Sequence, residues 1–139
     1  MPITHVPVTI ADAATYTVKA ENTGLRHYVP DLTADCTITL PAPKAGMWFE
    51  FLYKGVAADA QNWIIDTGSN TNYYIGGLAF NDNDTNVVSP IAGDGNSNSK
   101  LTIVTPDVGT IVRIESTNGT LWAVSGLASS ATIPSFADQ

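Results

Sequence analysis

The chain has 139 residues, a formal net charge of −7, 14% charged residues and 44% apolar residues. This length is typical of one domain, and the low charge with a high apolar content excludes a disordered acidic chain. No apolar run approaches the roughly 20 residues that cross a bilayer as a helix. The single cysteine, Cys36, excludes an internal disulfide framework.

The six Lys and Arg residues are scattered singly along the chain. A protein that binds a phosphate backbone or an anionic membrane gathers its cations, so neither nucleic acid nor a membrane is an expected partner. The first residues combine no basic region with an apolar stretch. We therefore expect no secretory signal, and synthesis in a cytoplasm.

In the first third of the chain, apolar and polar residues alternate with the two-residue period of half-buried strands. This period predicts short strands over 6–10, 15–20, 25–29 and 36–40, and Pro30 and Pro41 end the last two. The densest apolar run, 46–53, predicts a central strand in which Glu50 points outward. No apolar stripe of helical period runs for three turns.

The second part of the chain continues the pattern and predicts strands over 62–67, 72–75, 78–80, 100–105, 110–116 and 120–125. Asn118-Gly119 joins the last two strands and is a strong hairpin signal, because this pair tolerates positive φ. Residues 81–99 are rich in Asn, Asp, Gly and Ser. They predict a long surface loop around a small core contact made by Val87 and Val88.

Many short strands separated by turn residues indicate an all-β fold. We expect an antiparallel β-sandwich, a jelly-roll-like fold or a small barrel, with extended terminal arms. The expected organisation is an N-terminal arm over 1–12, a β domain over 13–125 and a C-terminal arm over 126–139.

No set of residues has the spacing that catalysis or metal binding needs. Asp82, Asp84 and Asn86 match the first ligands of a calcium loop, but Val87 and Gly93 stand where that loop needs Gly and Glu. Such clusters are typical of turns that bind their own backbone. The two histidines lack partners at zinc-ligand spacing, and no nucleophile elbow is present. We therefore predict no enzyme activity, no metal and no cofactor.

Aromatic residues offer a possible ligand surface. Trp48, Trp63, Trp122 and the pair Tyr73-Tyr74 could form a platform on which a sugar stacks. Trp63 and Trp122 lie in apolar strand contexts that favour the core, whereas one tyrosine of the pair must point outward. The possible ligand surface therefore comprises Tyr73, Tyr74, Asp82 and Asp84.

Several short motifs between residues 36 and 125 resemble those of a known family. They are Thr37-Ile38-Thr39-Leu40-Pro41, Trp48-Phe49-Glu50-Phe51 after Gly46, Ile75-Gly76-Gly77, Gly109 before the strand Ile111 to Ile114, and Gly119-Thr120-Leu121-Trp122-Ala123-Val124. In these motifs the chain resembles small β-rich virion surface proteins of tailed bacteriophages, which include head decoration (cement) proteins. The resemblance implies a homotrimer on the capsid exterior that binds the major capsid protein and stabilises the mature shell.

Two hypotheses follow from these observations. In the first, the protein is a structural cement whose proline-containing N-terminal arm contacts the capsid or a neighbouring protomer through Pro2, Ile3, Thr4, His5, Val6 and Pro7. In the second, it is a receptor- or glycan-binding fibre module. Tyr73-Tyr74 and the expected loop 81–99 would then make the contact.

Overall fold

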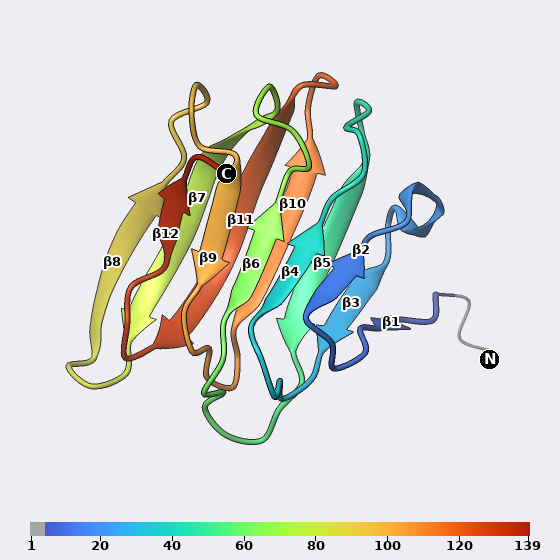
Figure 1. The fold of residues 1–139 in the computed structure, drawn as a ribbon. Helices are drawn as coiled ribbons and strands as arrows, with labels where there is room; N and C mark the ends of the chain where they lie inside the picture. The colour runs from blue at the N-terminus through green and yellow to red at the C-terminus, as the bar shows by residue number, and fades with distance from the viewer. Residues whose placement is uncertain (1–4) are drawn as a thin grey trace.

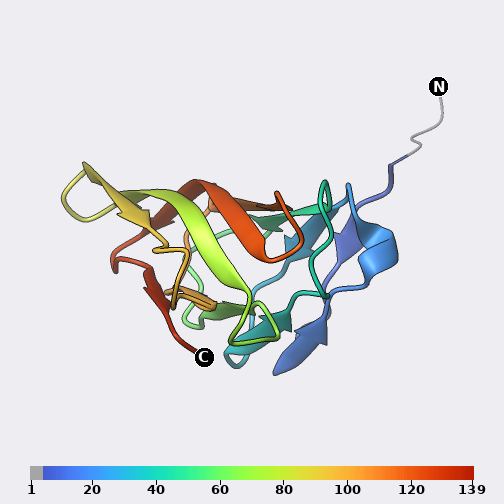
Figure 2. The ribbon, with the colours of Figure 1, turned by 90° about the horizontal axis from the view of Figure 1, so that it is seen from above.

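A computed structural model describes residues 5–139, which form two β-sheets and one short 3-10 turn. The seven-stranded sheet has the order β1-β3-β5-β10-β11-β7-β8, and the five-stranded sheet has the order β12-β9-β6-β4-β2 (Figure 1). Seen from above, the two sheets form two layers (Figure 2). The strands are β1 (Val8–Thr9), β2 (Thr15–Thr17), β3 (Arg26–Val29), β4 (Cys36–Thr39), β5 (Trp48–Tyr53), β6 (Trp63–Asp66), β7 (Tyr73–Asp82), β8 (Val87–Ala92), β9 (Lys100–Ile103), β10 (Ile111–Ser116), β11 (Leu121–Ser130) and β12 (Ser135–Ala137).

The first six strands alternate between the two sheets. β1, β3 and β5 belong to the seven-stranded sheet, and β2, β4 and β6 belong to the five-stranded sheet. The chain reverses at each crossing, so strands that are next but one in sequence run in the same direction and pair in parallel. The expected antiparallel arrangement is therefore wrong, and both sheets are mixed. Within residues 5–139 neither sheet closes, so the small barrel is wrong as well.

The core lies between the sheets and is built from the inward positions of both. β5 and β10 alternate half-buried and buried residues along their whole length. Phe49, Phe51, Trp63 and Trp122 are fully buried, as is Cys36, and the core positions predicted for both tryptophans are confirmed. Each such large side chain stabilises the fold by about 1.5–3 kcal/mol or more.

Strand β7 corrects two expectations about the middle of the chain. The predicted strands 72–75 and 78–80 are one strand, Tyr73–Asp82, which continues through Gly76 and Gly77. Gly76 has a φ of +69°, and a Cβ at Gly77 would collide with the carbonyl oxygen of Ile91. The expected loop 81–99 contains strand β8 as well, because Val87–Ala92 pairs with β7 in antiparallel register.

The hairpin predicted at Asn118-Gly119 is confirmed. β10 and β11 pair in antiparallel register from Ile111↔Leu127 to Ser116↔Trp122. Of the two turn residues only Gly119 has a positive φ, +83°. The side chain of Asn118 accepts hydrogen bonds from the amides of Thr120 and Leu121, at 3.0 and 2.9 Å, and so holds the turn closed.

Both terminal segments join the domain. β1 pairs with β3 at the sheet edge and Ile10 is fully buried, so only His5 to Pro7 of the described N-terminal segment precede the first strand. The predicted contact residues Pro2, Ile3 and Thr4 lie outside the described residues. The C-terminal arm expected over 126–139 is wrong: β11 continues to Ser130 and β12 pairs with β9. Phe136 of β12 packs against the core.

Candidate functional site

The outer face of the seven-stranded sheet carries the candidate site. Strand register places Arg26 of β3 beside Glu50 of β5, and Glu50 beside Arg113 of β10. All three residues occupy outward positions, because the residues next to each of them along its own strand are buried. A row of alternating charge therefore crosses three neighbouring strands, and Glu50 points outward as predicted.

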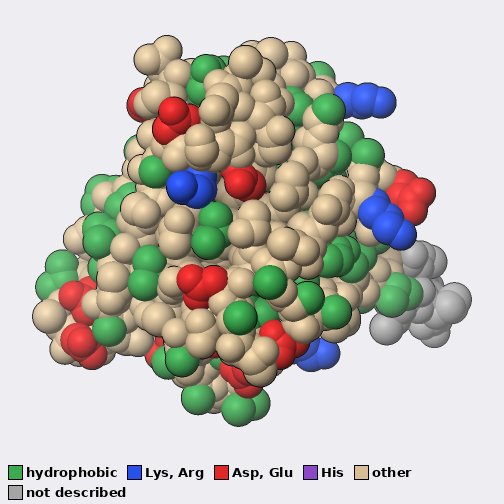
Figure 3. All heavy atoms as spheres, viewed as in Figure 1, with side chains coloured by type: hydrophobic (Ala, Val, Ile, Leu, Met, Phe, Trp, Pro, Cys, Tyr) green, Lys and Arg blue, Asp and Glu red, His purple; other side chains and the backbone are tan. Residues whose placement is uncertain are grey.

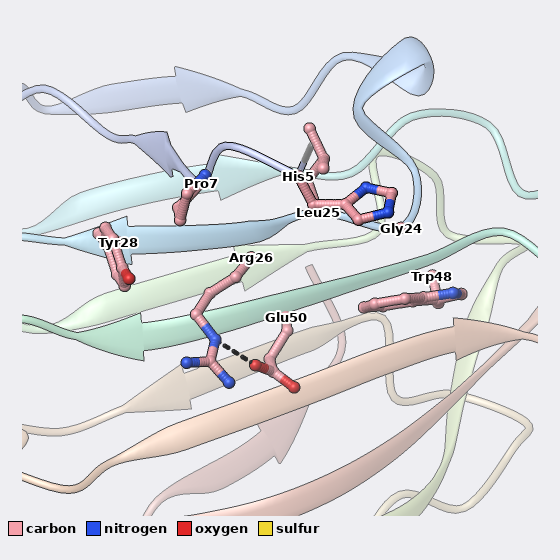
Figure 4. A pocket seen from close by; sticks show the side chains of 8 residues that line it. All are labelled: His5, Pro7, Gly24, Leu25, Arg26, Tyr28, Trp48 and Glu50. Carbon is pink, nitrogen blue, oxygen red and sulfur yellow. Dashed lines mark hydrogen bonds and ion pairs between the residues drawn. The ribbon is translucent and has the colours of Figure 1, made fainter. Parts of the chain in front are cut away.

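At one end of this row lies a hollow, which we name the β3–β5 hollow. It has a volume of about 580 Å³ and is lined by His5, Pro7, Gly24, Leu25, Arg26, Tyr28, Trp48 and Glu50. Figure 4 shows Tyr28 and Trp48 at opposite ends, with the Arg26–Glu50 pair between them. The hollow thus has an aromatic ring at each end and a paired charge in its centre.

Trp48 is held in place from both sides of its strand. Its amide donates to Thr23 Oγ1 at 3.1 Å, and its carbonyl accepts from the amide of Gly24 at 2.8 Å. The guanidinium of Arg113 lies over the indole, 4.0 Å from the ring centre. Trp48 lines the hollow, whereas Arg113 does not. Trp48 therefore forms part of the wall, and Arg113 supports its ring.

Arg26 and Glu50 form an ion pair at the centre of the hollow. Arg26 Nε donates to Glu50 Oε1 at 2.5 Å, and the side chains are 43% and 17% exposed. An exposed pair of this kind stabilises a fold by only about 0–1 kcal/mol, so its main effect is to orient the two groups. Within the described part of the chain the Arg26 guanidinium makes no other hydrogen bond. Its terminal NH₂ groups are free to bind a ligand.

The predicted ligand surface is not assembled as one site. Tyr73 is half-buried on the outer face, whereas Tyr74 is fully buried and its hydroxyl donates to the carbonyl of Ile65 at 2.9 Å. Burial raises the pKa of the Tyr74 hydroxyl well above its usual value. Asp82 and Asp84 lie at the opposite end of the strand from Tyr73, and nine residue steps of strand span about 30 Å.

Asp82 has a structural function in the β7–β8 turn. Its Oδ1 accepts from the amides of Asp84 and Thr85, at 3.0 and 3.3 Å. Hydrogen bonds from Thr85 and Asp84 lower the pKa of the Asp82 carboxyl. This arrangement is the turn, bound to its own backbone, that the sequence favours over a calcium loop.

Other aspartates bind loop backbone in the same way. Asp12 accepts from the amide of Thr33 at 3.0 Å, and Asp59 from that of Leu32 at 3.0 Å. Several acidic side chains are visible towards the lower end of the molecule in Figure 3. No group of three or more His, Cys, Asp or Glu side chains between residues 5 and 139 is arranged to hold a metal ion. The aspartates that bind amides in this way therefore stabilise loops.

A second surface lies at the other edge of the same sheet. This β7–β8 groove has a volume of about 400 Å³ and is lined by Gly77, Leu78, Ala79, Val88, Pro90, Ile91 and Ala92. The core contact expected at Val87 and Val88 is wrong, because these side chains are 55% and 63% exposed. Their strand lies at the sheet edge, beyond the end of the facing five-stranded sheet (Figure 1).

Comparisons with models of protein families, with curated proteins and with solved structures find no match to the chain. No helix within residues 5–139 is both long and apolar enough to cross a membrane.

Proposed function

We propose that this chain is a structural, non-enzymatic protein of a tailed-bacteriophage virion, which decorates the capsid exterior and stabilises the major capsid protein lattice. The observation that carries the proposal is the uncharged, apolar edge formed by β8, with Val87 and Val88 exposed beside a groove lined by apolar residues and glycine. Proteins that remain monomeric usually protect such an edge with charged residues. An apolar edge without charged residues is typical of a surface that is covered in an assembly.

Pro90 indicates how a partner would contact this edge. The amide of Gly93 donates to the carbonyl of Gly76 at 2.9 Å, so in antiparallel register the amide positions of Val88, Pro90 and Ala92 point away from β7. Proline has no N–H to donate at the centre of that open edge. Side-chain packing into the β7–β8 groove is therefore favoured over the addition of another strand.

The N-terminal segment supports a second contact at the opposite edge of the sheet. Val6 is 68% exposed, although β1 begins two residues later and Ile10 is fully buried in the domain. Contacts at opposite edges of one sheet are suited to a head-to-tail ring, in which one protomer's N-terminal segment meets the next protomer. The family resemblance favours a homotrimer. In each protomer the two layers would then form a sandwich of the jelly-roll kind.

The proposed stabilisation follows from mass action. A protein that binds only the mature lattice lowers the free energy of that lattice and leaves its dissociated subunits unchanged. Many small contacts, repeated over the shell, then resist its disruption.

Light scattering of the purified protein, followed by co-sedimentation with capsids that lack it, tests the proposal. Val88→Asp introduces a charge into the groove and should reduce co-sedimentation by at least tenfold. Val56→Asp is the matched control, because Val56 is 91% exposed in the β5–β6 loop and should bind like the wild type. Val6→Asp tests the opposite edge. Wild-type binding by both the Val88 and Val6 variants would contradict the proposal.

A further inference from the structure

We propose that the β3–β5 hollow is a binding site for a neutral saccharide. This inference does not depend on the β7–β8 groove of the capsid proposal, since the hollow and that groove lie at opposite ends of the seven-stranded sheet. The hollow does share the N-terminal segment, through His5 and Pro7, with the proposed second contact at Val6. It also differs from the ligand surface predicted at Tyr73 and Asp82, because it uses outward residues of β3 and β5.

The aromatic wall accounts for one half of saccharide recognition. The C–H face of a pyranose ring packs on an aromatic ring, and Trp48 lines the hollow. The guanidinium of Arg113 lies over the indole, 4.0 Å from the ring centre, and Thr23 and Gly24 fix the backbone of Trp48. The wall is therefore preorganised, which reduces the entropy lost when a ligand binds.

The ion pair accounts for the other half. A carboxylate only accepts hydrogen bonds and a guanidinium only donates them, whereas a sugar hydroxyl does both. Glu50 and the free NH₂ groups of Arg26 can therefore bind neighbouring hydroxyls of one ring. Because each charge already has an opposite partner, the pair favours neither an anionic nor a cationic ligand. The ligand class that this arrangement fits is a neutral polyol.

The backbone of the hollow argues against a peptide ligand. Extended peptides usually bind by adding a strand to an open sheet edge. β3 is paired with β1 on one side and with β5 on the other, so the strand that carries Arg26 and Tyr28 has no open edge. The hollow therefore presents side chains on a sheet face, and a peptide would find few backbone partners there.

NMR titration of the full-length protein tests the site. Methyl glycosides of glucose, galactose and mannose, and N-acetylglucosamine, are added at millimolar concentrations. We expect at least one of them to shift the indole N–H resonance of Trp48 and the amides of β3 and β5. Glu50→Gln keeps the side-chain shape but removes the charged acceptor, and should weaken that binding about tenfold or more. Trp48→Ala should abolish it.

Asp84→Asn is the matched control, because Asp84 is an exposed carboxylate in the β7–β8 turn at the opposite edge of the sheet and does not line the hollow. Its affinity should equal that of the wild type. The proposal is overturned if none of the four sugars shifts Trp48 in the folded protein, or if Glu50→Gln and Asp84→Asn weaken binding equally. Tighter binding of sialic acid or of a sulfated sugar would overturn the assignment to a neutral ligand. A synthetic peptide of residues 1–10 that shifts these resonances while the sugars do not would identify a second copy as the occupant.

Discussion

Replacing the buried Trp122 tests the account of the core. Trp122 is fully buried and packs against Phe49, with ring centres 6.1 Å apart. A tryptophan buries up to about 250 Å², which at about 25 cal/mol per Å² contributes about 6 kcal/mol. Within residues 5–139 its indole N–H has no hydrogen-bond partner, which costs about 1–3 kcal/mol. The difference predicts that Trp122→Ala lowers the free energy of unfolding by about 3–5 kcal/mol.

Calorimetry and urea unfolding followed by circular dichroism measure this change. For a domain of this size about 4 °C is lost per kcal/mol, so the Tm should fall by about 12–20 °C. Trp48→Ala is the control of the same residue type: its ring is half-buried on the outer face, and it should cost about 1–2 kcal/mol. Trp122→Phe keeps most of the ring, removes the unpartnered N–H and should cost under about 1.5 kcal/mol. Equal losses for Trp122→Ala and Trp48→Ala would refute the reasoning.

Two further predictions concern a buried histidine and a glycine. Burial lowers the pKa of His27, whose ring lies among Tyr16, Phe49 and Phe51 with Nε2 unpartnered. Its neutral form is favoured in the folded state, so the free energy of unfolding should be at its full value above the unfolded pKa of about 6.5 and should decline as pH falls below it. His27→Phe should flatten this part of a stability–pH curve. An unchanged slope would contradict the explanation. Gly77→Ala should lower the free energy of unfolding by about 1–3 kcal/mol, because the added Cβ meets the backbone of β8. Hydrogen exchange should show the loss of protection first in β8. Wild-type protection in β8 would contradict this prediction.

The sequence predicts strands well where apolar residues alternate between two environments. β5 and β10 each bury one face, so their alternation is complete and their limits are close to those expected. β8 was missed because its six residues, at an open edge, do not alternate strictly and include Pro90. Parallel pairing was missed because it depends on which sheet each strand joins, and short-range patterns do not record that choice.

The candidate hollow was only partly predictable. His5 and Pro7 were expected to make contacts, and Glu50 was expected to point outward, but nothing in the sequence brings these segments together. The signal that could have identified it is the outward set Arg26, Tyr28, Trp48 and Glu50, in which two strands each carry one aromatic and one charged residue. Using that signal requires knowing that β3 and β5 are neighbours, although they are separated by a strand of the other sheet.

The alternation of the first six strands between sheets has a consequence for how the chain folds. None of these strands pairs with its neighbour in sequence, so residues 5–66 contain no hairpin that could form early and act as a nucleus. Hairpins occur only later, at β7–β8 and β10–β11. Long loops must close before the early strands gain any pairing, which makes folding slow and highly cooperative. We therefore expect the N-terminal strands to pair after the hairpins of the C-terminal half have formed, and a ribosome-bound chain to gain this pairing late.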